Sequence, residues 1–257
     1  MKEETESFIK GYVKACRSKV PTATSWEEPL VAFADAQDPL FPRLKQLVDA
    51  QHFLPADLQA DAKTVVSYFL PFTRETTLSN ARGRGASEQW AKSYVETNQL
   101  ITNLSKAICE MLEQHGFRGA VTLPTHNFDE EKLVSNWSQK HVAYIAGLGT
   151  FGLHSMIITE KGCCGRLGSI VTNAEITPTQ RSAKEFCLFK LDGSCGACVK
   201  KCRPKALKAD SLDKRACYEE CLTNARKYAA LGLADVCGKC VVNVPCSFTN
   251  PSRAAKT

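Results

Sequence analysis

The stretch DGSCGACVKKCRPKAL, residues 192–207, contains Cys195, Cys198 and Cys202 in a C-x2-C-x3-C spacing. A [4Fe–4S] cubane needs four thiolates that converge on a small core, and a loop with this spacing delivers several of them from one tight turn. The stretch therefore predicts that the C-terminal part of the chain folds around iron–sulfur clusters and transfers electrons.

Further cysteines surround this stretch: nine of the chain's 13 lie between positions 187 and 246, enough for two cubanes with one thiol spare. In two-cluster ferredoxins the last cysteine of a run ligates the other cluster. Asp192 stands where the usual first cysteine would be, so Cys187 takes that role. The expected ligand sets are Cys187, Cys195, Cys198 and Cys246 for one cluster, and Cys202, Cys217, Cys237 and Cys240 for the other. Cys221 is left over, but it lies one helical turn after Cys217 and could exchange roles with it.

Disulfides and a zinc site are the other common uses of such thiols. The N-terminus is a charged amphipathic pattern without the apolar core of a signal peptide, so we expect a cytoplasmic chain and reduced thiols. One zinc ion on the two C-x2-C pairs would leave four of the cysteines without a function. Cys16 and Cys109 lie in predicted helices, and the adjacent Cys163 and Cys164 are expected in a loop or lining a pocket.

The composition is that of a globular protein: 257 residues with 44% hydrophobic content predict a larger domain over residues 1–180 and a smaller one over 181–257. No apolar run approaches the roughly 20 residues that cross a bilayer, which argues against a membrane span. The net charge of +6 is concentrated in the second domain. We interpret this excess first as compensation for anionic clusters, second as a docking surface for an acidic electron donor, and third as an RNA-binding surface.

Strands and helices alternate along the first domain, which predicts a layered α/β architecture. Helices are expected over residues 1–20, 86–115 and around 130–146. Strands are expected at 62–72, 117–124, 155–159 and 168–173, while residues 21–55 are expected to be irregular with short helices and the last eight residues to be a disordered tail.

Residues 146–173 contain a glycine-rich turn in which Gly147, Gly149 and Gly152 match the spacing G-x-G-x-x-G. A dinucleotide fingerprint should follow a strand and open a helix. Here a helical pattern precedes the glycines and a strand follows, so we reject that reading. The glycines instead let the backbone approach a flat cofactor or turn sharply between helix and strand.

Five segments in order carry a resemblance: AKTVVSYFLPF (62–72), ARGRG (81–85), WSQKHVAYIAGLGTFG (137–152), GRLGSIVTN (165–173) and the cysteine array. The chain resembles the epoxyqueuosine reductase family, relatives of the reductive dehalogenases, and most closely its short members from anaerobes. The resemblance implies a nitroreductase-like α/β domain that holds base-off cobalamin, followed by a small ferredoxin-like domain with two clusters. The candidate cofactor-binding residues are Gly147, Gly149, Thr150, Gly152, Arg166, Gly168 and Ser169.

The chain departs from the family pattern where that family places its acid. Leu133 stands at the position of the aspartate that donates a proton to the substrate, and residues 81–87 lack the family's Asp, Tyr and His. We therefore predict no epoxyqueuosine reductase activity and only non-specific tRNA binding. His141 and Tyr144, three residues apart on a predicted helix, are the candidate catalytic proton donors, and Lys140 and His154 are further candidates near the pocket.

These observations predict a redox protein in which two clusters relay electrons from a ferredoxin or flavodoxin to a corrinoid. The substrate would be a small molecule or a corrinoid-linked group. One alternative is a non-catalytic electron carrier or a reductive activator of another corrinoid protein. The other is an iron–sulfur flavoprotein with FMN in place of cobalamin.

Overall fold

A four-stranded sheet forms the centre of the computed structural model, which describes residues 1–19, 22–125 and 128–256. The strands follow the order β1-β2-β8-β3, and each adjacent pair is antiparallel. Their bounds are β1 (Leu30–Asp35), β2 (Thr64–Pro71), β3 (Gly119–Val121) and β8 (Gly165–Thr172). The expected mixed α/β class is confirmed, with an antiparallel sheet.

Strand β2 is the middle of this sheet and is buried along its whole length. Val65 and Phe69 contribute to the hydrophobic cluster on one face, and Val66 and Tyr68 to the cluster on the other. A strand covered on both faces has no solvent side. That is why its sequence is a continuous apolar run and does not alternate with polar residues.

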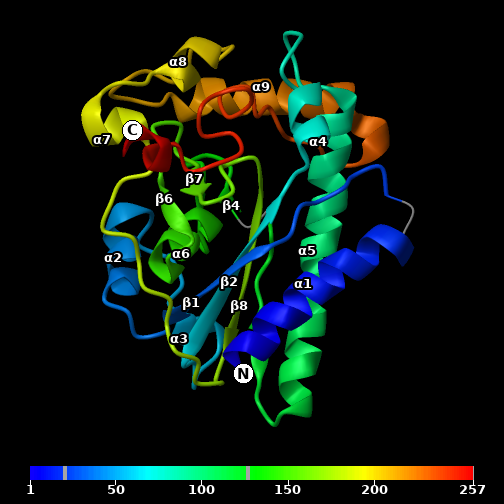
Figure 1. Cartoon of the computed structure of the whole chain (residues 1–257), viewed down its shortest axis with the longest axis vertical. Coiled ribbons are helices and arrows are strands. Elements are labelled where there is room, and N and C mark those ends of the chain that lie inside the picture. The colour runs from blue at the N-terminus through cyan, green and yellow to red at the C-terminus, as the bar shows by residue number, and fades with distance from the viewer. Residues whose placement is uncertain (20–21, 126–127, 257) are drawn as a thin grey trace.

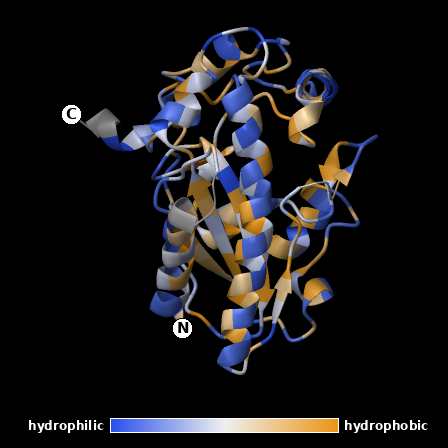
Figure 2. Ribbon diagram, turned by 90° about the vertical axis from the view of Figure 1, so that its right-hand side faces the viewer, coloured by the Kyte–Doolittle hydropathy of each residue, from blue (hydrophilic) through white to orange (hydrophobic). Residues whose placement is uncertain are grey.

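Helices cover both faces of the sheet (Figure 1). The 27-residue α5 (Glu88–Gln114) packs on β3 and β8 with α1 (Lys2–Lys19) beside it, while α6 (Gln139–Ala146) and α2 (Leu40–Leu47) cover the opposite face. Figure 2 shows the apolar strands enclosed between helices whose outer sides are hydrophilic. Helix α5 begins where Ser87 Oγ accepts a hydrogen bond from the backbone N–H of Trp90, a standard N-cap.

Shorter elements connect this framework. They are the helices α3 (Pro55–Leu58) and α4 (Arg74–Ser79) and two separate two-stranded pairs. The pairs are β4 (Phe128–Asp129) with β5 (Val134–Ser135), and β6 (Gly149–Phe151) with β7 (Ile157–Thr159). The β6–β7 pair directly follows α6, so the glycine-rich turn lies between a helix and a small hairpin.

The cysteine-rich part of the chain lies at one end of the molecule, at the top of Figure 1. It contains α7 (Leu188–Asp192), α8 (Ala197–Lys201), α9 (Lys214–Lys227) and the 3-10 helices η1 (Ala229–Leu231) and η2 (Pro251–Lys256). The segment between η1 and η2 returns to the first part of the chain. There the Cys163 N–H donates to the Cys246 carbonyl at 3.0 Å, and Asn80 Nδ2 donates to the Cys237 carbonyl at 2.8 Å.

Three expectations about local structure were wrong. Residues 21–55, expected to be irregular, contain β1. The helix expected from residue 130 begins only at Gln139, because the β4–β5 pair occupies the preceding residues and Leu133 has φ +54. The expected disordered tail contains η2. Among the described residues, no helix is long and apolar enough to cross a membrane.

Candidate functional site

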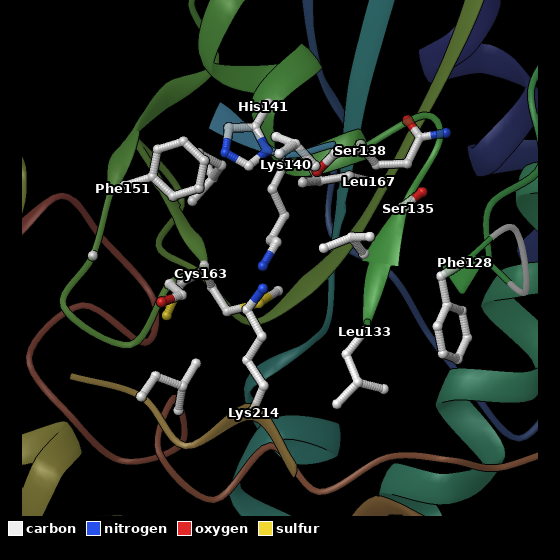
Figure 3. A pocket seen from close by; sticks show the side chains of 18 of the residues that line it. Phe128, Leu133, Ser135, Ser138, Lys140, His141, Phe151, Cys163, Leu167 and Lys214 are labelled. Atoms are coloured by element: carbon white, nitrogen blue, oxygen red, sulfur yellow. Dashed lines mark hydrogen bonds between the residues drawn. The ribbon is translucent and has the colours of Figure 1, made fainter. Parts of the chain in front are cut away.

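A cavity of about 780 Å³ lies between the α/β framework and the cysteine-rich part of the chain. Its lining comes from the segment 133–141, the β6–β7 hairpin, the first residues of β8 and the beginning of α9. The volume falls in the upper part of the range of small-molecule and cofactor sites. Figure 3 shows this cavity from close by.

Much of the wall is apolar. Phe69, Leu133, Trp137, Phe151 and Leu167 all contribute to it. Leu133 holds a left-handed backbone conformation, with φ +54, which is uncommon for a residue with a branched side chain. Backbone strain of this kind is often found at functional sites. Leu133, which the sequence comparison expected in place of an acid, lies at the cavity wall, and none of the described lining residues is an aspartate or glutamate.

His141 lines the cavity from the start of α6. Its Nδ1 lies 2.8 Å from Ser138 Oγ, and its ring centroid lies 4.9 Å from that of Phe151. Burial lowers the pKa of His141 to about 4, and the nearby Lys140 acts in the same direction. At neutral pH the imidazole is thus uncharged and can exchange a proton with a ligand. Tyr144, the other candidate proton donor, is 37% exposed and is not part of the lining.

The shifted pKa of His141 predicts a pH-dependent stability. Because the folded-state pKa lies below the ordinary value of 6.5, the unfolded chain takes up a proton first as the pH falls. The stabilisation that comes from keeping His141 uncharged is present in full above pH 6.5 and is lost as the pH falls towards 4. Between pH 8 and 5.5 the wild type should lose about 1.4 kcal/mol more free energy of unfolding than His141→Gln. Urea unfolding of both proteins at each pH measures this difference, and parallel pH profiles would contradict the assignment.

Of the seven candidate cofactor residues, two line the cavity: Gly152 and Arg166. Arg166 stacks on the Tyr94 ring, with its guanidinium carbon 4.1 Å from the ring centroid. Its Nε is buried and has no hydrogen-bond partner among the described residues. An unsatisfied buried donor at a cavity wall is unfavourable unless a ligand or water accepts from it.

The structure places the other five candidates outside the lining. Gly147 ends α6 with φ +88, and a Cβ on Gly149 would lie 1.9 Å from the Ile158 carbonyl oxygen. Gly147 permits a sharp turn and Gly149 permits close pairing of two strands. Both glycines thus make room for the protein's own backbone and not for a cofactor.

Three residues of this group contact the chain's own core. The Thr150 hydroxyl accepts from the Phe186 N–H at 2.8 Å, and a Cβ on Gly168 would meet the Tyr68 ring. Ser169 Oγ donates to Gln139 Oε1 at 2.8 Å and accepts from the Trp137 indole at 3.0 Å. Their polar atoms and their space are thus used within the protein.

A second, much smaller cavity gathers four thiols that the sequence assigned to one cluster. It is lined by Cys187, Cys195, Cys198 and Cys246, together with His154. Burial raises the pKa of the Cys198 thiol to about 11, as expected for a thiol in apolar surroundings. The distant Cys246 reaches this cavity because its segment pairs with the loop before β8.

His154 and Cys163 both approach Cys246. The potential ligand atoms of these three residues lie within 4.8 Å of one another, and His154 Nε2 is 3.3 Å from Cys246 Sγ. Hydrogen bonds from Cys163 and His154 hold the pKa of the Cys246 thiol at about 5. Because His154 Nδ1 accepts a hydrogen bond from the Met156 N–H at 3.2 Å, Nε2 is the ring nitrogen that donates to the sulfur of Cys246.

The remaining thiols form a neighbourhood around α9. Hydrogen bonding between Cys217 and Cys221 lowers the pKa of Cys217 to about 7 and raises that of Cys221. Burial is the largest cause of the raised pKa of Cys240, and the charges of Cys237, Cys217 and Cys202 raise it further. These thiols therefore lie close enough to Cys240 to affect its ionisation. Cys217 and Cys221 also line the large cavity.

Lys239 lies between two of these cysteines in the sequence and is only 4% exposed. Its ammonium donates to the backbone carbonyls of Asn80 at 2.8 Å and Arg82 at 2.7 Å. No described carboxylate pairs with it. A buried cation without an anionic partner is unfavourable, and a negatively charged group at the adjacent thiolates would neutralise it.

The sequence did not predict two features of the large cavity. Lys214, the first residue of α9, lines it opposite Lys140, and the cavity brings Cys217 and Cys221 against the α/β framework. These residues lie more than 70 positions from Lys140 in the chain. Helical spacing could place Lys214 and Cys217 on one side of α9, but no local pattern indicates which element that side faces.

Solved structures share this fold. An epoxyqueuosine reductase from Streptococcus thermophilus matches with a TM-score of 0.55 and 18% identity over 92% of this chain and 65% of its own. One from Bacillus subtilis matches with 0.58 and 16% over 95% of this chain and 66% of its own. A catabolic reductive dehalogenase matches with 0.61 and 14% over 88% of this chain and 31% of its own.

The fold resemblance expected from the sequence is confirmed by these neighbours. A related dehalogenase structure is described in terms of B12-dependent dehalogenation. The chain spans about two thirds of the length of the epoxyqueuosine reductases that it matches. No protein-family model matches the chain, and no curated protein sequence matches it.

Proposed function

Starting from the fold that it shares with epoxyqueuosine reductases and B12-dependent reductive dehalogenases, we propose that this protein is a reductase. In this proposal two [4Fe–4S] clusters in a ferredoxin-like domain, residues 181–257, pass single electrons to a base-off corrinoid in the large cavity. The first 180 residues form the nitroreductase-like domain that holds the corrinoid. An external low-potential donor, a ferredoxin or flavodoxin, reduces the clusters.

The cysteines fit two clusters. Cys187, Cys195, Cys198 and Cys246 line one cavity, which supports the first ligand set. The neighbourhood of Cys202, Cys217, Cys221, Cys237 and Cys240 offers one thiol more than a second cubane needs. The buried ammonium of Lys239 beside Cys237 suits an anionic cluster, because two cubanes with four thiolates each carry net negative charge.

The large cavity suits a broad organic cofactor. It is wide, mostly apolar and supplied with polar groups at a few places, among them the unsatisfied Arg166 Nε. A bound corrinoid would supply a strongly reducing, nucleophilic cobalt. Gly152 and Arg166 would hold it, the apolar wall would exclude water, and the uncharged ring of His141, oriented by Ser138, would donate a hydrogen bond to a ligand or accept a proton from it.

One observation favours this proposal over the alternatives: Cys217 and Cys221 line the same cavity as His141 and Arg166. A simple electron carrier does not need a cavity of about 780 Å³ beside its cluster ligands. A flavin at the same site would make the protein an iron–sulfur flavoprotein. Cobalamin binding distinguishes the two possibilities.

Anaerobic reconstitution followed by addition of hydroxocobalamin tests the proposal. We expect about eight iron and eight sulfide per chain and a shift of the cobalamin spectrum to the base-off form. Arg166→Met should weaken cobalamin binding, whereas Arg43→Met, on the outer side of α2, should leave it unchanged. Retention of a flavin without cobalamin binding would favour the flavoprotein, and two clusters without either cofactor would favour the carrier.

The hydrogen bond from His154 to Cys246 predicts a shift in cluster potential. A donor to a cluster sulfur stabilises the reduced, more negative state. His154→Phe should lower the midpoint potential of one cluster by about 40 mV, which corresponds to about 1 kcal/mol for one electron. His154→Gln keeps an N–H donor and should shift it less. Redox titration followed by EPR measures this effect, and a raised or unchanged potential in His154→Phe would contradict it.

A further inference from the structure

The large cavity has an unbalanced charge. Its described lining contains the basic residues Lys140, His141, Arg166, Lys190 and Lys214, and no aspartate or glutamate. His141 is uncharged at neutral pH, and Arg166 stacks on the Tyr94 ring. The positive charge available to a ligand in the middle of the cavity therefore comes mainly from lysines.

Two of these lysines approach each other from opposite sides. Lys140 extends from α6 of the α/β framework, and Lys214 extends from α9 of the cysteine-rich part. Figure 3 shows the two ammonium groups pointing towards each other across the cavity. Burial lowers the pKa of Lys140, and the charge of Lys214 lowers it further. Two like charges brought together in a partly dehydrated place are unfavourable unless an anion lies between them.

Neither ammonium has an anionic partner in the described part of the chain. No salt bridge or hydrogen bond to a described carboxylate involves Lys140 Nζ or Lys214 Nζ, although other lysines, such as Lys92 with Glu88, form such pairs. The carboxylate nearest in sequence to Lys214 is that of Asp213. It accepts a hydrogen bond from the Ala216 N–H as the N-cap of α9. No described carboxylate therefore neutralises the lysine pair, and the negative group that acts on Lys140 is the thiol of Cys217.

We propose that the cavity binds an organic anion whose carboxylate or phosphate group lies between Lys140 and Lys214. The apolar wall formed by Leu133, Phe151 and Leu167 receives the body of the molecule. This inference rests on the proposed function in one respect: within a reductase, the anion is the molecule that is reduced. Its binding chemistry depends only on the lysine pair and the apolar wall.

The same anionic chemistry has a second source, because the nucleotide loop of cobalamin carries a phosphate. Cobinamide is a corrinoid without that loop, so it separates the two sources. If lysine replacement weakens the binding of cobalamin but not that of cobinamide, the pair holds the cofactor's phosphate. If it weakens the binding of an organic anion and leaves both corrinoids unaffected, the pair holds the substrate.

Isothermal titration calorimetry on the anaerobically reconstituted protein tests the proposal with phenylacetate, phenyl phosphate and the neutral phenylacetamide. The anions should bind at least tenfold more tightly than the amide. Lys140→Met and Lys214→Met should each weaken anion binding about tenfold, and Lys140→Arg should retain it because the charge is kept. Lys106→Met, an exposed lysine of α5, is the matched control and should leave binding unchanged.

Two results would overturn the inference. One is that the protein binds the anions and the amide with equal affinity, and that Lys140→Met and Lys214→Met leave the affinities for cobalamin and cobinamide unchanged. The other is an altered cluster potential in Lys140→Met with unchanged ligand binding, which would make Lys140 a counter-charge for the thiolate of Cys217. A protein that binds anions but lacks clusters or ignores cobalamin would uphold the anion site and contradict the proposed function alone.

Discussion

Replacing Cys198 by serine should reduce the iron content from about eight to about four per chain. Cys198 is buried in the small cavity with Cys187, Cys195 and Cys246, so its loss removes one thiolate of a single proposed cluster. A cubane with three protein thiolates is labile. Iron and sulfide analysis together with the EPR spectrum of the reduced protein measures the loss.

The other cysteines provide matched controls for this experiment. Cys16→Ser, in α1, should keep both clusters. Cys237→Ser should remove the cluster that survives in Cys198→Ser. Cys221→Ser should keep eight iron if Cys217 is the ligand, and loss of a cluster in that variant would exchange their roles. Stoichiometric zinc without sulfide in the wild type, or two intact clusters in Cys198→Ser, would contradict the assignment.

Replacing Gly149 by alanine should prevent stable folding. A Cβ at this position would lie 1.9 Å from the Ile158 carbonyl oxygen within the β6–β7 pair, and a backbone atom cannot move away as a side chain can. We expect the free energy of unfolding to fall by more than about 4 kcal/mol, because the added methyl group would overlap a backbone atom in a closely packed strand pair. Thermal unfolding and the yield of folded protein measure it.

Gly11 offers the opposite case and serves as the control. It lies inside α1, and a Cβ there meets nothing within 4 Å, so Gly11→Ala should stabilise the protein by about 0.5–1 kcal/mol. Gly149→Ala should lose iron and cobalamin binding together, because the fold fails. Loss of cobalamin binding with wild-type stability and iron content would show that Gly149 instead touches the cofactor.

The fold was predictable where local patterns are strong. The apolar residues of 86–115 recur at helical spacing, and the structure has α5 there; the continuous apolar run at 62–72 became β2. Strand β1 was missed because Pro29, Pro39 and Pro42 dominate the local pattern around it. Its hydrogen bonds come from β2, whose paired residues lie 29 to 39 positions further along the chain, and a single segment does not reveal such a partner.

The site was less predictable because its members converge only through tertiary packing. His141 and Tyr144 share a helical neighbourhood, but α6 buries Val142, Ala143 and Ile145 against the sheet, and this orientation sends His141 to the cavity and Tyr144 to solvent. The helical spacing alone fixed their relative directions but not which of them would face a ligand.

The return of the segment containing Cys237, Lys239 and Cys246 to the α/β framework has a consequence for folding kinetics. Its hydrogen bonds to the framework join residues 77 to 159 positions apart, so the loops that must close are long and the contact order is high. The proposed first cluster needs Cys246, which reaches its place only when this segment docks. We therefore expect the framework to fold first and iron insertion to follow docking. Refolding experiments should show a slow phase in cluster absorbance after the helical signal is complete.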